Sequence, residues 1–249
     1  MARAALRRRL NWRVGIVVDL RAETDRVTSI VLRLAGWPGH RAGQHVDVRL
    51  TAEDGYSTQR SYSIASAPDG ARVELTVERL EDGEVSSYLV DELRPDDELE
   101  LRGPIGGYFV WEQSLGGPLV LLAGGSGIAP LRAMLRHRLR SGSAVPVRLL
   151  YSARSQSELI YRDELADAGR RGGVDVRFTL TRERPDGWQG YDRRIDRELI
   201  AEVAWPPAER PLVYICGPTA FVETAADALL ALGHDPGRIR TERFGPTGG

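Results

Sequence analysis

The sequence predicts two domains, an antiparallel β-barrel over residues 1–115 followed by a parallel-sheet α/β domain over residues 116–249. The length of 249 residues suits two domains of ordinary size. Up to about Leu101, apolar and polar residues alternate in short strands, whereas strands alternate with helices from Pro118 onward. The glycine-rich residues 114–118 separate the two patterns, so we place the domain boundary there.

Period-two alternation predicts the strands of the barrel. Strands are expected at 14–18, 27–32, 46–50, 59–66, 73–77 and 99–101. Turn residues such as Asp54-Gly55 and Asp82-Gly83 separate them. One helix is expected at 85–93, with Leu89 and Leu93 on its inner face. Short strands at this spacing are typical of a small closed barrel.

The second half alternates strands with helices. Strands are expected at 119–123, 147–151, 174–180 and 211–216, and helices at 128–140, 157–168, 196–203 and 219–232. A further strand is expected to end at Phe244. This alternation favours a parallel sheet with helices on both faces and with ligands at the carboxyl ends of its strands.

The first strand of that sheet runs into a glycine-rich turn. Apolar residues 119–123 are followed by Gly124-Gly125-Ser126-Gly127, and a helical pattern begins at Ile128. Unpaired amides at such a helix start favour an anion above the strand. This stretch by itself supports a phosphate site and a ligand-free turn equally.

Composition excludes several classes of function. A net charge of −1 with 28% charged residues argues against a nucleic-acid binder with a broad basic surface. Cys216 is the only cysteine, so an internal disulfide, a zinc cluster or a cysteine-held iron–sulfur centre cannot form within the chain. The four histidines lack metal-ligand spacing. Without a signal-peptide core or a membrane-length apolar run, a soluble cytoplasmic monomer is expected.

The strand at 59–66 presents a cation and an aromatic ring on one face. Arg60 and Tyr62 suit a flat ligand that carries a phosphate, although an ordinary exposed strand explains them as well. Further along, Arg79, Gly83 and Ser86 precede or open the predicted helix. Together with Arg60 they would make a diphosphate cradle, and simple capping of the helix is the alternative.

Five motifs, in order, resemble those of the ferredoxin–NADP reductase superfamily. Arg60-Ser61-Tyr62-Ser63 resembles its R-x-Y-S flavin signature, and residues 83–87 resemble its second flavin-phosphate motif. Residues 103–109 are similar to its G-P-x-G-x-F turn, with Tyr108 at the aromatic position and Phe109 next to it. Residues 124–130 resemble its pyridine-nucleotide loop, with Ser126 in place of threonine, and Cys216-Gly217-Pro218 resembles its third nucleotide motif.

The resemblance implies a role for each matching residue. Tyr62 would stack on the flavin of FAD, and Ser63 would hydrogen-bond near the flavin N5 that receives hydride. The FAD pyrophosphate would be held by Arg60, Arg79, Gly83, Val85 and Ser86. The nicotinamide nucleotide would contact Gly125, Ser126, Gly127, Cys216, Gly217 and Pro218. Ser63 and Cys216 are thus the catalytic candidates, and Phe244 is expected over the flavin face.

Three further residues favour NADPH over NADH. Thr181 and Arg182 end a predicted strand where NADPH-specific members of the family carry a similar Ser-Arg pair, and Arg154 ends the preceding strand. Tyr191 is placed to stack on the adenine. The alternative is that the arginines in 182–184 are ordinary loop charges. Glu242 is interpreted as a solvated carboxylate rather than a proton relay.

The implied activity is hydride transfer from NADPH to FAD, followed by release of single electrons to a separate acceptor. The acceptor is expected to be a ferredoxin or another iron–sulfur or haem protein, because this chain lacks the cysteines for a cluster. NADH remains possible as the donor. Two alternatives are a reductase of free flavin or oxygen, and a non-catalytic flavin-binding regulatory subunit.

Overall fold

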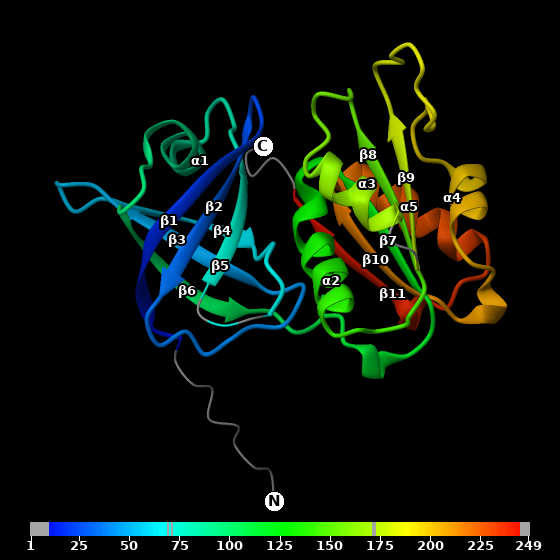
Figure 1. Ribbon diagram of the computed structural model, residues 1–249, viewed down its shortest axis with the longest axis horizontal. Helices are drawn as coiled ribbons and strands as arrows, with labels where there is room; N and C mark the ends of the chain where they lie inside the picture. Colours follow the sequence, from blue (N-terminus) through cyan, green and yellow to red (C-terminus); the bar gives the residue numbers. More distant parts are fainter. Residues whose placement is uncertain (1–9, 69, 71, 171–172, 245–249) are drawn as a thin grey trace, which may run out of the picture.

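The computed structural model describes residues 10–68, 70, 72–170 and 173–244. Two sheets lie side by side in it, an antiparallel one in the first half of the chain and a parallel one in the second (Figure 1). The sequence also carries an arginine cluster at 7–9, which we expect to be a solvated terminus, with a contact to acidic lipid or an acidic partner as the alternative; it lies outside the described residues. Within the described ranges, none of the helices is both long enough and apolar enough to cross a membrane.

The predicted β-barrel is confirmed. Six antiparallel strands have the order β4-β3-β6-β1-β2-β5. Their bounds are β1 (Trp12–Thr24), β2 (Val27–Leu34), β3 (His45–Thr51), β4 (Ser57–Ser63), β5 (Arg72–Glu78) and β6 (Glu98–Ile105). A bridge between Ile64 and Leu75 joins the two edges just beyond the end of β4. The apolar side of each strand faces inward, where residues such as Val46, Val48 and Leu101 are fully buried.

The helix predicted at 85–93 has the right place but an irregular form. It consists of one α-helical turn, α1 (Glu84–Ser87), followed by a π-helical turn, η1 (Tyr88–Glu92). Leu89 and Leu93 are buried in the barrel core as predicted.

The predicted parallel α/β domain is also confirmed. Five parallel strands have the order β11-β10-β7-β8-β9. Their bounds are β7 (Leu119–Gly124), β8 (Val147–Ala153), β9 (Val174–Leu180), β10 (Leu212–Gly217) and β11 (Ile239–Arg243). The helices are α2 (Ile128–Arg140), α3 (Arg162–Arg170), α4 (Arg197–Val203) and α5 (Thr219–Ala231). Short 3₁₀ turns are η2 (Gln113–Leu115), η3 (Gly125–Gly127), η4 (Pro207–Glu209) and η5 (Pro236–Arg238).

The helices cover both faces of the parallel sheet. Leu119 and Leu121 of β7 pack with the apolar residues of α2 and α3, whereas Val120 and Leu122 pack with those of α4 and α5. Because successive strand residues point to opposite faces, one continuous apolar strand serves both layers. Of the helices, α2 lies next to the barrel in Figure 1.

The helix predicted at 157–168 begins later, at Arg162, which corrects that expectation. Tyr161 has φ +60, a left-handed backbone conformation that interrupts a right-handed helix. Its side chain and those of Leu159 and Ile160 are buried in the core instead. The carbonyl of Tyr161 accepts a hydrogen bond from the Leu165 amide at 2.9 Å, which starts α3.

The two domains share apolar packing at their junction. Phe109 and Trp111, which follow β6, are buried in the same cluster as α2, and Ala42 from the barrel half joins them. Phe109 meets the Tyr214 ring edge-on, at 5.1 Å between centroids. The boundary between residues 115 and 116 falls just beyond this packing, and its position stays a prediction.

Candidate functional site

Arg60 and Tyr62 lie on the edge strand β4 and share one face of it. They pair with Val48 and Val46 of β3, so their side chains leave the strand on the side of the barrel core. Tyr62 is half-buried against that core, and burial raises the pKa of its phenol to about 12, partly opposed by Arg60. Tyr62 is therefore a neutral, fixed aromatic surface at physiological pH.

Ser63 ends β4 and is buried. Among the described residues, none forms a hydrogen bond with its hydroxyl, since only its backbone takes part in the pairing with β3. A hydroxyl that has no protein partner, on a side chain otherwise buried, is suited to a ligand atom. Its proposed place near the reacting atom of a flavin stays a prediction.

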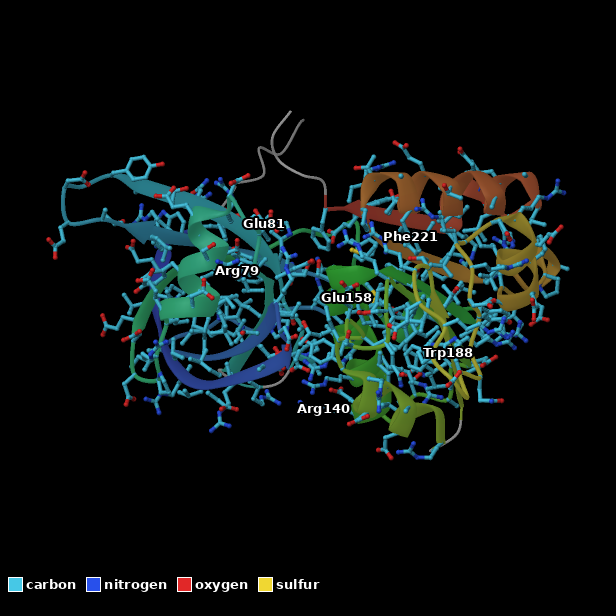
Figure 2. All side chains as sticks on the ribbon, turned by 90° about the horizontal axis from the view of Figure 1, so that it is seen from above. Arg79, Glu81, Arg140, Glu158, Trp188 and Phe221 are labelled. Atoms are coloured by element: carbon cyan, nitrogen blue, oxygen red, sulfur yellow. The ribbon has the colours of Figure 1, made fainter. Side chains whose placement is uncertain are left out.

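The two arginines predicted for a diphosphate differ in their surroundings. Within the described residues, the Arg60 guanidinium hydrogen-bonds only to its chain neighbours, donating to the Gln59 carbonyl at 2.8 Å and to the Thr58 hydroxyl at 3.4 Å. The Arg79 guanidinium instead donates to an Asp91 carboxylate oxygen at 2.7 Å. Arg79 lies on the barrel near α1 (Figure 2), with η1 providing its carboxylate partner.

The turn before α1 is closed by its own side chains. Ser86 Oγ donates to the Gly83 carbonyl at 3.1 Å and accepts from the Leu80 amide at 3.2 Å. A Cβ on Gly83 would lie 2.3 Å from Ser86 Oγ, so this turn requires glycine. Val85 is buried and anchors the helix, whose first-turn amides have no side-chain cap. Those amides, rather than the Ser86 hydroxyl, are available to an anion.

The glycine turn after β7 is packed tightly on one side and open on the other. A Cβ on Gly127 would lie 2.2 Å from the Cys216 carbonyl oxygen, whereas one on Gly125, at φ +55, would meet nothing within 4 Å. The ring of Phe221, labelled on α5 in Figure 2, lies 3.0 Å from the Cβ position of Gly124. The backbone of the turn is thus fixed while its outer surface is accessible, as a phosphate site requires.

Cys216 lies at the end of β10, in register with Ala123 of β7 and Glu242 of β11. Burial, and then the nearby Glu242, raise the pKa of its thiol well above the usual range. Cys216 is consequently a neutral, buried thiol and not an activated nucleophile. After it, Gly217 packs against Gly124, and Pro218 precedes the first turn of α5.

Glu242 of β11 is half-buried, rather than the fully solvated carboxylate that we expected. Burial raises its pKa to about 7, and its strand pairing places it beside Cys216. The sequence signal for this placement beside Cys216 is that Glu242 lies near the end of the last predicted strand. Next to it, the Phe244 amide donates to the Gly217 carbonyl at 2.9 Å, and the Phe244 ring is half-buried.

The three residues predicted for the 2′-phosphate come together at the carboxyl edge of the sheet. The Thr181 amide donates to the Ala153 carbonyl at 3.0 Å, and the Arg182 amide donates to the Arg154 carbonyl at 2.9 Å. Both arginines are exposed, and neither guanidinium has a hydrogen-bonding or ionic partner in the described part of the chain. Arg184, in contrast, pairs with Asp192 at 2.7 Å and is an ordinary loop charge. Tyr191 is engaged at its hydroxyl, which bonds with Arg177 and Glu202.

These features fit a dinucleotide cofactor in the barrel and a nicotinamide nucleotide at the sheet edge. On the barrel, Arg60, the first-turn amides of α1 and the Tyr62 ring offer a cation, backbone donors and an aromatic surface. At the sheet edge, the fixed glycine turn and the free guanidinium groups offer backbone donors and positive charge. A separate cavity of about 560 Å³, lined by residues such as Arg21, Tyr161 and Arg162, takes in no residue predicted to bind a cofactor.

Comparison with known proteins agrees with this division. Residues 31–110 match the family model described as the oxidoreductase FAD-binding domain, and residues 121–227 match that of the oxidoreductase NAD-binding domain. The chain is similar to a protein named ferredoxin–NADP reductase B from Sorangium cellulosum (strain So ce56). The two are 39% identical over 210 residues, which are 82% of this chain and 84% of the relative.

Two further proteins are similar over a larger share of this chain. A flavohemoprotein of Rhizobium meliloti (strain 1021) is 34% identical over 251 residues, or 94% of this chain and 61% of its own length. The chain therefore spans about three fifths of that relative. The solved flavohem-like FAD/NAD-binding domain of nitric oxide dioxygenase from Vibrio cholerae has 29% identity and a TM-score of 0.83, over 94% of this chain and 99% of that one.

Proposed function

The chain belongs to the ferredoxin–NADP reductase family of FAD-dependent NAD(P)H oxidoreductases, and we propose that it takes hydride from NADPH and passes single electrons to a separate protein. One observation carries the proposal, the convergence of both sites on β5. Ile64, directly after Ser63, pairs with Leu75 of β5, and the glycine turn η3 lies against the same strand. The flavin motif and the nucleotide motif thus meet at one strand, as transfer between two rings requires.

The residues of the barrel would hold and orient the flavin. Bound FAD supplies the conversion of a hydride into two separately released electrons. Tyr62 would support the ring, and Ser63 would offer its hydroxyl to the reacting edge. Arg60, Arg79 and the amides of the turn that contains Gly83, Val85 and Ser86 would hold the pyrophosphate.

The residues of the second domain would hold the nicotinamide end. Gly125, Ser126 and Gly127 would offer backbone donors, and Cys216, Gly217 and Pro218 would shape the floor of the site. As a neutral thiol, Cys216 would act by its size rather than by attack. Phe244, fixed to Gly217 through its amide, would cover the flavin face.

NADPH is proposed as the preferred donor. Arg154, Thr181 and Arg182 lie together at the carboxyl ends of β8 and β9, and both guanidinium groups are unpaired in the described part of the chain. A 2′-phosphate would give them their charge-assisted partner. NADH carries a neutral hydroxyl in that position, which offers the guanidinium groups no charged partner.

The proposed acceptor is a ferredoxin or another iron–sulfur or haem protein. Relatives of this chain are named as a ferredoxin–NADP reductase and a flavohemoprotein. With one cysteine in the sequence, this chain cannot build its own cysteine-held cluster. We further propose that it acts as a monomer, with domains divided between residues 115 and 116.

An absorbance spectrum of the purified protein, followed by anaerobic addition of NADPH, tests the proposal. Bound yellow flavin that bleaches supports it. A colourless protein that reduces added flavin would indicate a free-flavin reductase, and bound flavin that does not bleach would indicate a binding subunit. Steady-state rates with both nucleotides test the donor, and equal specificity constants or a preference for NADH would contradict NADPH.

A further inference from the structure

A cluster of charged residues joins the two domains away from both proposed ligand sites. Arg132 Nη1 of α2 donates to Glu74 Oε1 of β5 at 2.6 Å, and Arg136 Nη1, one turn later, donates to Glu74 Oε2 at 2.8 Å. Both arginines also bind Glu164 of α3, at 2.7 Å from Arg132 Nη2 and 2.6 Å from Arg136 Nε. We name Glu74, Arg132, Arg136 and Glu164 the interdomain clamp.

Two members of the clamp, Glu74 and Arg132, are removed from water, whereas the side chains of Arg136 and Glu164 are 22% and 35% exposed. The side chain of Arg132 is 2% exposed and that of Glu74 is 7% exposed. Burial alone would raise the pKa of Glu74, but Arg132, Arg136 and Arg21 together lower it, so the carboxylate stays charged. Replacing buried ion pairs by apolar residues is often neutral or stabilising, so stability alone is a weak reason for such a network. Its geometric effect is to fix the orientation of the two domains.

Tyr161 adds a second attachment beside the clamp. The Arg132 guanidinium carbon lies 3.6 Å from the centre of the Tyr161 ring. The Tyr161 hydroxyl reaches into the barrel, where it bonds with Thr76 of β5 and with Ser29 of β2. A buried tyrosine in a left-handed backbone conformation costs free energy that the surrounding contacts must offset.

The clamp is directly connected to both proposed sites. On the barrel side, the backbone of Glu74 bonds with Ala65 and with the Ser66 hydroxyl, just after Tyr62 and Ser63. On the other side, Arg132 follows the glycine turn by five residues of one helix, about 7 Å of rise along its axis. A rotation about the clamp would therefore move the glycine turn relative to the flavin motif.

We propose that Glu74, Arg132 and Arg136 are positioning residues for hydride transfer, which hold the nicotinamide site at its working distance from the flavin site. This role rests on the proposed function. The clamp contains none of the residues proposed to bind either ligand, so loss of one of its charges would change the distance between the sites and leave each separate binding site intact.

The first experiment uses Glu74→Gln in the FAD-loaded protein. A shift of about 1 Å in reacting groups can cost 10²-fold in rate, so we expect the anaerobic rate of flavin reduction by NADPH to fall by about 10- to 100-fold. FAD content and the Kd for NADP⁺ should stay near the wild-type values. Glu74→Asp, which keeps the charge, should restore part of the rate, whereas a merely structural loss would lower FAD content and rate together.

A matched control is Glu100→Gln. Glu100 forms a close ion pair with Arg49 at 2.8 Å, but both residues belong to the barrel. Flavin reduction should therefore be unchanged in this variant. Tyr161→Phe provides a milder change at the junction if Glu74→Gln folds poorly, and it should lower the rate in the same direction.

A second measurement does not depend on activity. Spin labels at Glu81→Cys on the barrel and Glu223→Cys on α5 report the distance between the domains, because both positions are exposed and Cys216 is buried. Glu74→Gln should broaden or shift the distance distribution, and Glu100→Gln should leave it narrow.

The outcomes separate the two proposals. If wild-type protein binds FAD but NADPH does not reduce the bound FAD, the proposed function is wrong. The proposed role of the clamp in hydride transfer is then wrong as well. If the wild type is reduced and Glu74→Gln matches it in rate, the clamp proposal is overturned, whatever the distances show. Slow transfer together with a changed distance and intact ligand binding supports it.

Discussion

The barrel and the edge of the parallel sheet both present arginines to a proposed phosphate, but they prepare them differently. On the barrel, Arg79 is held by Asp91, and Ser86 is bonded within its own turn. At the sheet edge, the guanidinium groups of Arg154 and Arg182 have no partner in the described ranges. Groups that are already fixed lose less conformational entropy on binding, which suits a resident cofactor. Unpaired, hydrated groups suit a nucleotide that must leave after each turnover.

The largest effect is expected on folding stability, in the glycine turn after β7, whose backbone is packed tightly against β10. In Gly127→Ala, the new Cβ would meet the Cys216 carbonyl oxygen at 2.2 Å, so overpacking against the backbone should lower the free energy of unfolding by about 3 kcal/mol or more. NADP⁺ binding should weaken as well. Chemical denaturation and nucleotide titration measure both. Gly169→Ala in α3 is the control, because its Cβ would meet only ordinary contacts at 3.7 Å, and a similar loss there would contradict the explanation.

The next largest effect is expected on the affinity of the barrel for FAD. Arg60→Ala removes a charge-assisted bond worth about 1.5–3 kcal/mol, so the Kd for FAD should rise by about 10- to 100-fold. Fluorescence titration of the apoprotein with FAD measures it. Arg33→Ala, an exposed arginine on β2, is the control. Equal effects of the two substitutions on the Kd for FAD would show that Arg60 does not bind the cofactor.

A smaller and more selective effect is expected at the sheet edge. Arg182→Ala should lower kcat/KM for NADPH by about tenfold and leave that for NADH unchanged, because only NADPH carries the 2′-phosphate. Arg184→Ala should change neither, since Arg184 is paired with Asp192. A parallel loss with both nucleotides would show that Arg182 does not distinguish them.

The last prediction concerns the pH dependence of stability. The pKa of Glu242 is about 7 in the folded chain against an ordinary value of 4.5, so the folded state keeps a proton that the unfolded state loses. The stability from this group is complete below pH 4.5 and is lost as pH rises to about 7. The Tm of Glu242→Gln relative to wild type should therefore rise across that interval. Glu223→Gln on the surface of α5 should show no such trend, and a flat difference for Glu242→Gln would mean that its pKa is ordinary.

Patterns local in sequence predicted both sheets and placed the motif residues at strand ends. Alternation of period two marks a strand wherever one face is buried, and a glycine turn before a helix is local as well. The clamp was not predicted because Glu74 and Arg132 are 58 residues apart, and arginines four residues apart on a helix resemble a solvated face. The start of α3 was placed too early because a tyrosine at positive φ has no sequence signature. The burial of Glu242 depends on pairing between β10 and β11, which no local pattern specifies.

The position of β6 in the barrel has a consequence for synthesis. Residues Glu98–Ile105 lie between β3 and β1, so the ribbons β4-β3 and β1-β2-β5 are joined along the sheet by this last strand, apart from the single bridge between Ile64 and Leu75. During synthesis on the ribosome, the β3 edge of one ribbon and the β1 edge of the other would stay unpaired until β6 emerges. Exposed edges of that kind are where unwanted pairing begins, so chaperone demand should peak before that strand is complete.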